Sequence, residues 1–166
     1  MGRAKVSAWR AAQPEWFRGA YLDGVLVGVC CGAEADDAVV LQSIGVLYEH
    51  WRQGIGSRLL RDFEDAVFNS SRVAGISLGS ADDVPTEAFY MKNGYGVRSI
   101  MLTVPGGAPE PAPGARQPSR VRNDGDNRVL YFEVDEYDRL LRESLVASHA
   151  ASQGLFIFEK PNPAPA

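Results

Sequence analysis

The sequence contains only two cysteines and two histidines, and these shortages exclude several kinds of site. Cys30 and Cys31 are adjacent, and adjacent residues of a strand point to opposite faces, so they indicate neither a disulfide nor a shared metal site. His50 and His149 lie far apart in the chain, which argues against a zinc site. We therefore expect no metal, and a reducing, cytoplasmic location.

Long apolar runs and an excess of positive charge are also absent. No run of about 18 apolar residues occurs, and no charged leader precedes an apolar segment, so we expect neither a membrane span nor a secretion signal. The formal net charge is −4, which disfavours nucleic acid and anionic membranes as partners. The same sign suits a cationic substrate such as an amine.

What remains is the composition of an ordinary soluble domain, with 166 residues, 45% hydrophobic and 23% charged. Residues Tyr21 to Gly32 are predicted to form a strand or hairpin with its turn at Asp23-Gly24. Predicted strands alternate with predicted helices, which indicates an α/β fold. The segment Pro105 to Asn127 differs, because it is rich in proline and glycine and has few apolar residues to bury. We expect it to be a mobile, solvated insertion without strands.

One stretch organises the chain, running from Val46 to Leu60. It begins as an apolar strand, passes through a polar turn and ends as an amphipathic helix. Gly54 and Gly56 lie where the helix begins, although glycine is a poor helix former. Without side chains there, backbone N–H groups of the first turn can contact a ligand, and they favour an anion such as a phosphate. The alternative is a tight strand-to-helix connection. The predicted apolar face is Ile55, Leu59, Leu60, Phe63 and Val67, and the predicted polar face is Arg58, Arg61, Asp62, Glu64 and Asp65.

A second stretch has the signals of a short helix that ends sharply. Asp83 precedes Val84-Pro85, which suits a helix cap followed by proline in the first turn. Gly94 then suits a left-handed helix end.

The first stretch resembles the acyl-CoA-binding motif of the GNAT N-acetyltransferases, a strand valine followed by Arg/Gln-x-x-Gly-x-Gly/Ala. Trp51 takes the place of the usual Arg or Gln, and Tyr48 stands where a proline is common. The second stretch resembles another GNAT signature, an "A-x-x-L-Y-x-K-x-G-F"-like helix end. Two such motifs in this order are more specific than either alone. The matching positions are Phe89, Tyr90, Gly94 and Tyr95, with Asp83 and Thr86 where the family often has Asn and Ala.

The resemblance implies a GNAT-like mixed, mostly antiparallel twisted sheet flanked by helices, in a single acyltransferase-like domain spanning residues 1–166. Its core would be residues 21–104, followed by the flexible insertion 105–127 and a C-terminal strand-helix-strand segment, 128–160, with Asp135 as the helix cap. The usual first strand and first one or two helices of the family, which help wall the acceptor site, are largely missing. The chain would then be a shortened form completed by a partner subunit, with a homodimer as one option, or an incomplete gene product.

The resemblance also implies a reaction, the transfer of an acetyl group from acetyl-CoA to an amine of a small molecule or protein, directly in a ternary complex. The backbone at Val46 and Leu47 would hold the pantetheine arm and polarise the thioester. Tyr90 would protonate the leaving thiolate, since a phenol with a pKa of about 10 is protonated at neutral pH. Alternatively, its ring anchors the helix. The residues expected to bind the cofactor are Val46, Leu47, Trp51, Arg52, Gln53, Gly54, Ile55, Gly56, Ser57 and Asp83.

Three further points stay open from the sequence. The acceptor amine must be neutral to react, so a general base is expected to remove its proton. Glu49, His50 and Asp83 are candidates for this base, and none is assigned. A non-catalytic acyl-CoA-binding module is the main alternative function. A serine hydrolase using Ser77 is a remote alternative, because Gly75-Ile76-Ser77-Leu78-Gly79 matches a nucleophile elbow but Ser77 is expected inside a strand.

Overall fold

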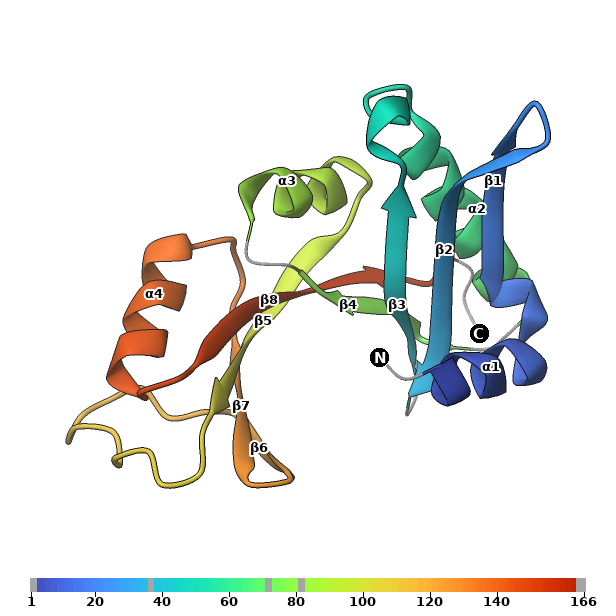
Figure 1. Ribbon diagram of the computed structural model, residues 1–166. Coiled ribbons are helices and arrows are strands. Elements are labelled where there is room, and N and C mark those ends of the chain that lie inside the picture. Colours follow the sequence, from blue (N-terminus) through green and yellow to red (C-terminus); the bar gives the residue numbers. More distant parts are fainter. Residues whose placement is uncertain (1–2, 36–37, 71–72, 81–82, 164–166) are drawn as a thin grey trace. The chain divides into compact units, whose positions relative to one another are not determined.

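The computed structural model describes residues 3–35, 38–70, 73–80 and 83–163. The chain divides into two compact units, one formed by residues up to 78 together with those from 160 onward, the other by residues 79–159. Each unit contains strands and helices (Figure 1).

The first unit is a sheet with strands in the order β1-β2-β3-β4. Neighbours β1–β2 and β2–β3 are antiparallel, whereas β3–β4 is parallel. The helix α2 packs on β1, β2 and β3. Its elements are α1 (Arg3–Ala12), the 3-10 helix η1 (Pro14–Trp16), β1 (Phe17–Leu22), β2 (Val25–Ala35), β3 (Ala38–Val46), the 3-10 helix η2 (Tyr48–His50), α2 (Ile55–Ser70) and most of β4 (Gly75–Gly79).

The predicted apolar face of α2 is confirmed, because each of its five residues is at most 5% exposed. Of these five residues, only Ile55 lies in the first turn of the helix. Its buried side chain anchors the start of the helix in the core, while the residues around it remain accessible. The predicted polar face is wrong at Glu64, which is 5% exposed. Its neighbours Leu60, Phe63 and Val67 share its side of the helix, and Nζ of Lys160 lies 2.6 Å from its carboxylate. A partly exposed lysine therefore compensates a buried acid.

The hairpin joining β1 and β2 turns at Asp23-Gly24, as the sequence predicts. Both residues have positive φ, 48° and 79°, which is the geometry of a two-residue turn that follows the twist of the strands. β1 begins at Phe17, before the predicted start at Tyr21, and α1 and η1 precede it.

The second unit is an antiparallel sheet in the order β8-β5-β7-β6, with two helices. Phe156 and Phe158 are fully buried on one face, since residues two apart in a strand share a face. The ring of Phe158 lies 6.0 Å from Tyr90 of α3, and that of Phe156 lies 5.3 Å from the guanidinium of Arg142 of α4. Both helices therefore cover the same face. The elements are α3 (Val84–Lys92), β5 (Gly96–Val104), β6 (Arg120–Asp124), β7 (Asn127–Glu133), α4 (Arg139–Ser148) and most of β8 (Gln153–Pro161).

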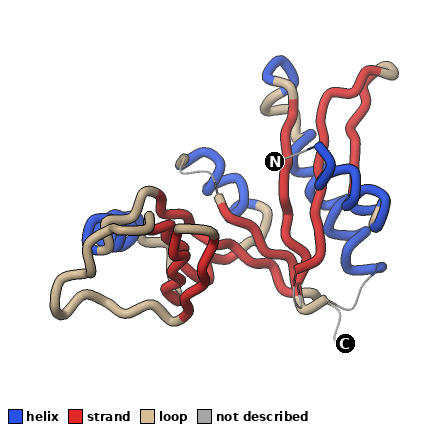
Figure 2. The backbone as a smooth tube through the Cα atoms, turned by 60° about the horizontal axis from the view of Figure 1, so that its bottom comes forward, coloured by secondary structure: helices blue, strands red, loops and turns tan. Residues whose placement is uncertain are grey.

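Two sequence predictions in this unit are wrong. Residues 120–124 form the strand β6, paired with β7 in a hairpin, within the segment expected to have no strand (Figure 2). Every residue of β6 is exposed, so its sequence carries no alternation of buried and exposed residues that would indicate a strand. The guanidinium of Arg120 stacks on Tyr131 of β7, 3.9 Å from its ring centroid. The cap of α4 is Asp138, which accepts a bond from the amide of Leu141, and not Asp135.

The fold class predicted from the sequence is confirmed as mixed α/β with mostly antiparallel strands flanked by helices. Residues 105–119 contain no helix or strand, but side chains hold them to the sheet. Arg116 donates to the carbonyl of Glu133 at 2.6 Å, and Arg128 pairs with Glu110 at 3.3 Å.

Candidate functional site

In the first unit, the residues between β3 and α2 form a turn with unusual backbone geometry. Arg52 has φ of +60° and Gly54 has φ of +76°, both in the left-handed region. The carbonyl of Gly54 accepts the first helical hydrogen bond, from the amide of Arg58 at 3.1 Å, so Gly54 is the cap of α2. A glycine cap has no side chain to bond the first amides of the helix.

We call the backbone amides of residues 52–57 the amide turn. In the described part of the chain, no amide of this turn donates to a backbone carbonyl. The first amides of a helix carry the positive end of its dipole, and turns with alternating left-handed residues form concave sites for anions. An added Cβ at Gly54 would meet no atom within 4 Å, so the space beside the turn is open. The amide turn can hold a phosphate.

Next to the amide turn, β3 has a free edge. Its described pairs with β4 are confined to Ala38, Val39 and Val40, so pairing on this side stops six residues before the strand ends at Val46. An unpaired edge of this kind can accept an extended ligand as an added strand.

The groups available at the end of β3 can be assigned from the neighbouring bonds. The amide of Leu47 donates to the carbonyl of Val27 on β2 at 2.8 Å, and its carbonyl accepts from the amide of His50 at 2.9 Å. Both backbone groups of Leu47 are thus used within the protein. Because backbone groups alternate along a strand, those of Val46 point to the side away from β2. Of the two residues predicted to hold a pantetheine arm, Val46 is the one with backbone groups on the free edge.

Trp51 lies over this corner with much of its ring in solvent. Its side chain is 57% exposed, and its indole N–H donates to the carbonyl of Val46 at 2.7 Å. Its ring centroid is 5.0 Å from that of Tyr48, which is 78% exposed. The side chain of Gln53 donates to the carbonyl of Glu49 at 3.4 Å. Both predicted cofactor-binding side chains therefore contact their own turn.

In the second unit, α3 carries the remaining predicted residues. Asp83 caps the helix, with Oδ1 accepting from the amide of Thr86 at 3.2 Å, as its sequence position predicts. Tyr90 is 7% exposed. Its ring lies among other aromatic rings, 5.3 Å from Phe89, 5.9 Å from Tyr95 and 6.0 Å from Phe158. These contacts fit the alternative role of Tyr90 as a helix anchor and are compatible with a catalytic hydroxyl.

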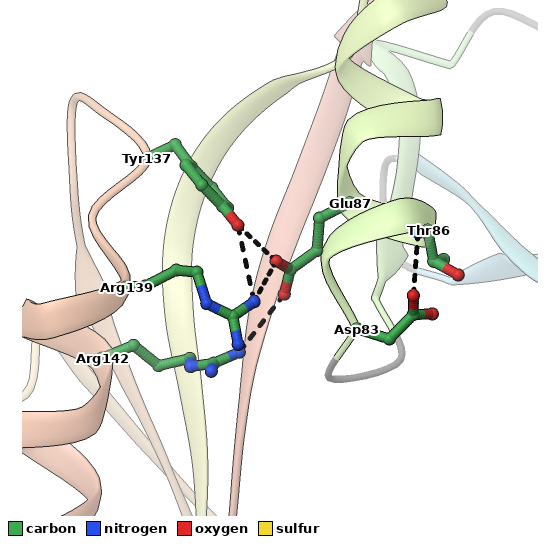
Figure 3. A network of polar contacts seen from close by, with 6 residues as sticks. All are labelled: Asp83, Thr86, Glu87, Tyr137, Arg139 and Arg142. Atoms are coloured by element: carbon green, nitrogen blue, oxygen red, sulfur yellow. Dashed lines mark hydrogen bonds and ion pairs between the residues drawn. The ribbon is translucent and has the colours of Figure 1, made fainter.

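A buried charge cluster on α3 was not predicted from the sequence. The carboxylate of Glu87, which is 0% exposed, accepts bonds from the hydroxyl of Tyr137 and from the guanidinium groups of Arg139 and Arg142 (Figure 3). Arg142 Nη1 lies 3.2 Å from Oε1. Burial and the hydrogen bond to Glu87 raise the pKa of Tyr137, so this phenol stays neutral. The cluster joins α3 to α4 within the second unit.

The remaining candidate residues are two possible general bases and one possible nucleophile. Glu49 is exposed and His50 is partly exposed, next to the amide turn in sequence. Ser77 lies inside β4, opposite Val40, and not at a strand end, which argues against a nucleophile elbow. Burial raises the pKa of Cys30 far above the ordinary thiol range, so this thiol is not a nucleophile at neutral pH.

The described residues contain no group of three or more His, Cys, Asp or Glu side chains placed to hold a metal ion. No helix in the described ranges has the length and apolar character needed to cross a membrane.

Solved structures with a similar fold include an acetyltransferase complex. The structure of Naa50 from Arabidopsis thaliana with the bisubstrate analogue CoA-Ac-MVNAL has a TM-score of 0.52 at 19% identity, with 79% of this chain and 80% of that chain covered. Ard1 from Thermoplasma volcanium has a TM-score of 0.53 at 18% identity, with 81% and 80% covered. The NatB acetyltransferase complex with a bisubstrate inhibitor has a TM-score of 0.60 at 16% identity, with 98% and 77% covered. The chain thus shares its fold with these proteins.

A sequence model described as the Acetyltransferase (GNAT) family matches residues 3–95, more than half of the 166 residues. The chain belongs to the GNAT acetyltransferase family. The match starts at residue 3, so it includes N-terminal residues that the motif comparison left out. A search of curated proteins gave no match. The family is one of acetyl-CoA-dependent acetyltransferases with amine acceptors, and the predicted family is confirmed.

Proposed function

We propose that this protein transfers an acetyl group from acetyl-CoA to an amine in a direct reaction within a ternary complex. The observation that carries the proposal is the amide turn, whose amides have no backbone acceptors and which lies at the end of the free edge of β3. A diphosphate and an extended amide-containing arm are the two parts of coenzyme A that such a corner would bind.

In this proposal the chain's own groups have separate roles. The amide turn binds the pyrophosphate, and the free edge at Val46 aligns the pantetheine arm. The amine nitrogen attacks the thioester carbonyl carbon, the carbon–sulfur bond breaks, and the thiolate takes a proton. Tyr90 is the proposed donor of that proton, because a phenol is protonated at neutral pH. The amine loses one proton to a base that we leave unassigned.

The proposed acceptor is an amine of a small molecule or of a protein. The Naa50 structure was solved with an analogue that joins CoA to a peptide. This makes peptide N-termini the first acceptors to test, followed by polyamines, free amino acids and lysine side chains. Release of free thiol from acetyl-CoA reports turnover for all of them.

Calorimetry with coenzyme A tests the binding step. The wild-type protein should bind, and Gly54→Leu should abolish binding, because its side chain would enter the space beside the amides. Gly125→Leu is the matched control, since Gly125 also has a positive φ of 60° and also has no atom within 4 Å of an added Cβ. Equal loss in both variants, or no loss in either, would remove the amide turn from the proposal.

The second candidate function is a non-catalytic acyl-CoA-binding module, which the deep burial of Tyr90 among aromatic rings favours. The two functions differ in one result. The module binds coenzyme A without thiol release on any acceptor, whereas the enzyme releases thiol with at least one.

A further inference from the structure

Trp51 is the largest side chain beside the amide turn, and the hydrophobic core does not explain it, because more than half of its surface is exposed. We propose that Trp51 is a positioning residue that holds the amide turn in its anion-binding shape through the carbonyl of Val46. This inference rests on the proposed binding of coenzyme A to the same turn. It assigns Trp51 a role through its neighbours, in place of the direct ligand contact expected from the motif.

The first support is the set of bonds that close the corner. The indole N–H of Trp51 donates to the carbonyl of Val46 at 2.7 Å, across five residues of sequence. Its backbone N–H donates to the carbonyl of Tyr48 at 3.1 Å, and its ring lies against the Tyr48 ring. Trp51 is thus fixed to the end of β3 by its side chain and to η2 by its backbone.

The second support is the strain that follows directly in the chain. Arg52 adopts φ of +60°, a left-handed conformation that is unfavourable for a residue with a Cβ. Such a conformation persists only where neighbouring structure fixes it. Gly54 adopts its own positive φ without this cost, because it has no Cβ. Trp51, which is anchored by its indole bond, immediately precedes Arg52 in the chain. Release of the indole bond should therefore let Arg52 relax and disperse the amides.

The third point concerns which end of coenzyme A contributes most to binding. The Trp51 indole already engages the carbonyl of Val46, and the backbone groups of Leu47 are engaged as well. The free edge therefore offers a pantetheine arm few acceptors at this corner, whereas the amide turn offers its whole set of donors. The geometry predicts that this protein recognises its donor mainly through the pyrophosphate.

The test is Trp51→Phe, which keeps an aromatic ring and removes the indole N–H. Loss of one hydrogen bond should raise the dissociation constants of coenzyme A and of ADP in parallel by about 3- to 10-fold. The affinity for pantetheine, which has no phosphate, should not change, and turnover at saturating acetyl-CoA should stay within about twofold of wild type, because a positioning residue acts on binding. Tyr48→Phe is the control, since it removes the hydroxyl from the neighbouring exposed ring and should leave all three affinities unchanged.

Three results with the Trp51→Phe variant would overturn the inference. Trp51→Phe could bind coenzyme A and ADP as wild type does, could lose pantetheine affinity only, or could bind more tightly, which would make the indole a competitor of the ligand. A wild-type protein that binds no coenzyme A would refute the proposed function together with this inference. The hydrogen bond itself is tested without ligand: in the free protein, exchange of the Trp51 indole proton should be slowed, and exchange at the rate of a solvated indole would contradict the anchor.

Discussion

Glu87 of α3 and Arg142 of α4 form an ion pair that is almost completely removed from solvent, with 3.2 Å between Oε1 and Nη1. The residues are 0% and 3% exposed. Removing one partner of a buried pair leaves the other charge without compensation, which typically costs about 3–5 kcal/mol. We expect Glu87→Gln to lower the free energy of unfolding by that order, as measured by denaturant titration.

Glu110→Gln is the matched control for this prediction. Glu110 also pairs with an arginine of the same unit, Arg128 at 3.3 Å, but its side chain is 80% exposed. Exposed pairs contribute about 0–1 kcal/mol, so the control should unfold almost as wild type does. A Glu87→Gln variant as stable as the control would show that the cluster does not hold α3 to α4.

The cap of α3 gives a second prediction. Asp83→Ala removes the side-chain acceptor for the amide of Thr86 and should cost about 1 kcal/mol of stability, whereas Asp83→Asn keeps an acceptor and should cost little. Asp138→Ala, at the cap of α4, should cost a similar amount. If Asp83→Asn is stable but binds coenzyme A more weakly, Asp83 contacts the ligand. If it binds normally, Asp83 acts as a cap only.

Tyr90→Phe tests the proposed proton donor. Without the hydroxyl, turnover should fall by about 100-fold or more, with coenzyme A affinity within about twofold of wild type. Tyr95→Phe is the control, because its ring packs 5.9 Å from Tyr90 in the same cluster and it has no proposed role in proton transfer. Unchanged turnover in Tyr90→Phe would leave this residue the role of an aromatic anchor.

The buried thiol of Cys30 predicts an alkaline loss of stability. Burial raises its pKa above the ordinary thiol value of 9.0, so the folded state keeps the proton at a pH where the unfolded state releases it. Above that value the unfolded state binds fewer protons, and the free energy of unfolding should fall by up to about 1.4 kcal/mol per pH unit. Cys30→Ala should lose this slope, measured by denaturant unfolding from pH 6 to 11. Equal slopes above pH 9 would contradict the prediction, and below pH 8 the two proteins should run parallel.

Local patterns allowed much of the fold to be predicted from the sequence. The 3.6-residue period gave the buried face of α2, the Asp23-Gly24 pair gave the hairpin turn, and Asp83 gave the start of α3. Each of these signals lies within a few residues, where propensity and periodicity act. The same holds for the amide turn, since glycines at a helix start are visible in the sequence.

Features that depend on distant partners were missed. Glu87 looks like a surface acid of a short helix, and only its pairing with arginines more than 50 residues away explains its burial. Glu64 was assigned to the polar face because its partner, Lys160, lies 96 residues further on. β6 has no apolar pattern, but a signal was available in Gly125-Asp126, a glycine-first pair that suits a two-residue hairpin turn and directly precedes β7.

The parting of β3 from β4 after Val40 leaves the sheet of the first unit unfinished along one side. A donor molecule bound there would take the place of the missing strand, and its binding would stabilise the folded state. By mass action, a ligand at a hundredfold excess over its dissociation constant adds about 2.7 kcal/mol to the free energy of unfolding. The melting temperature of this protein would thus report the fraction of donor sites that are occupied.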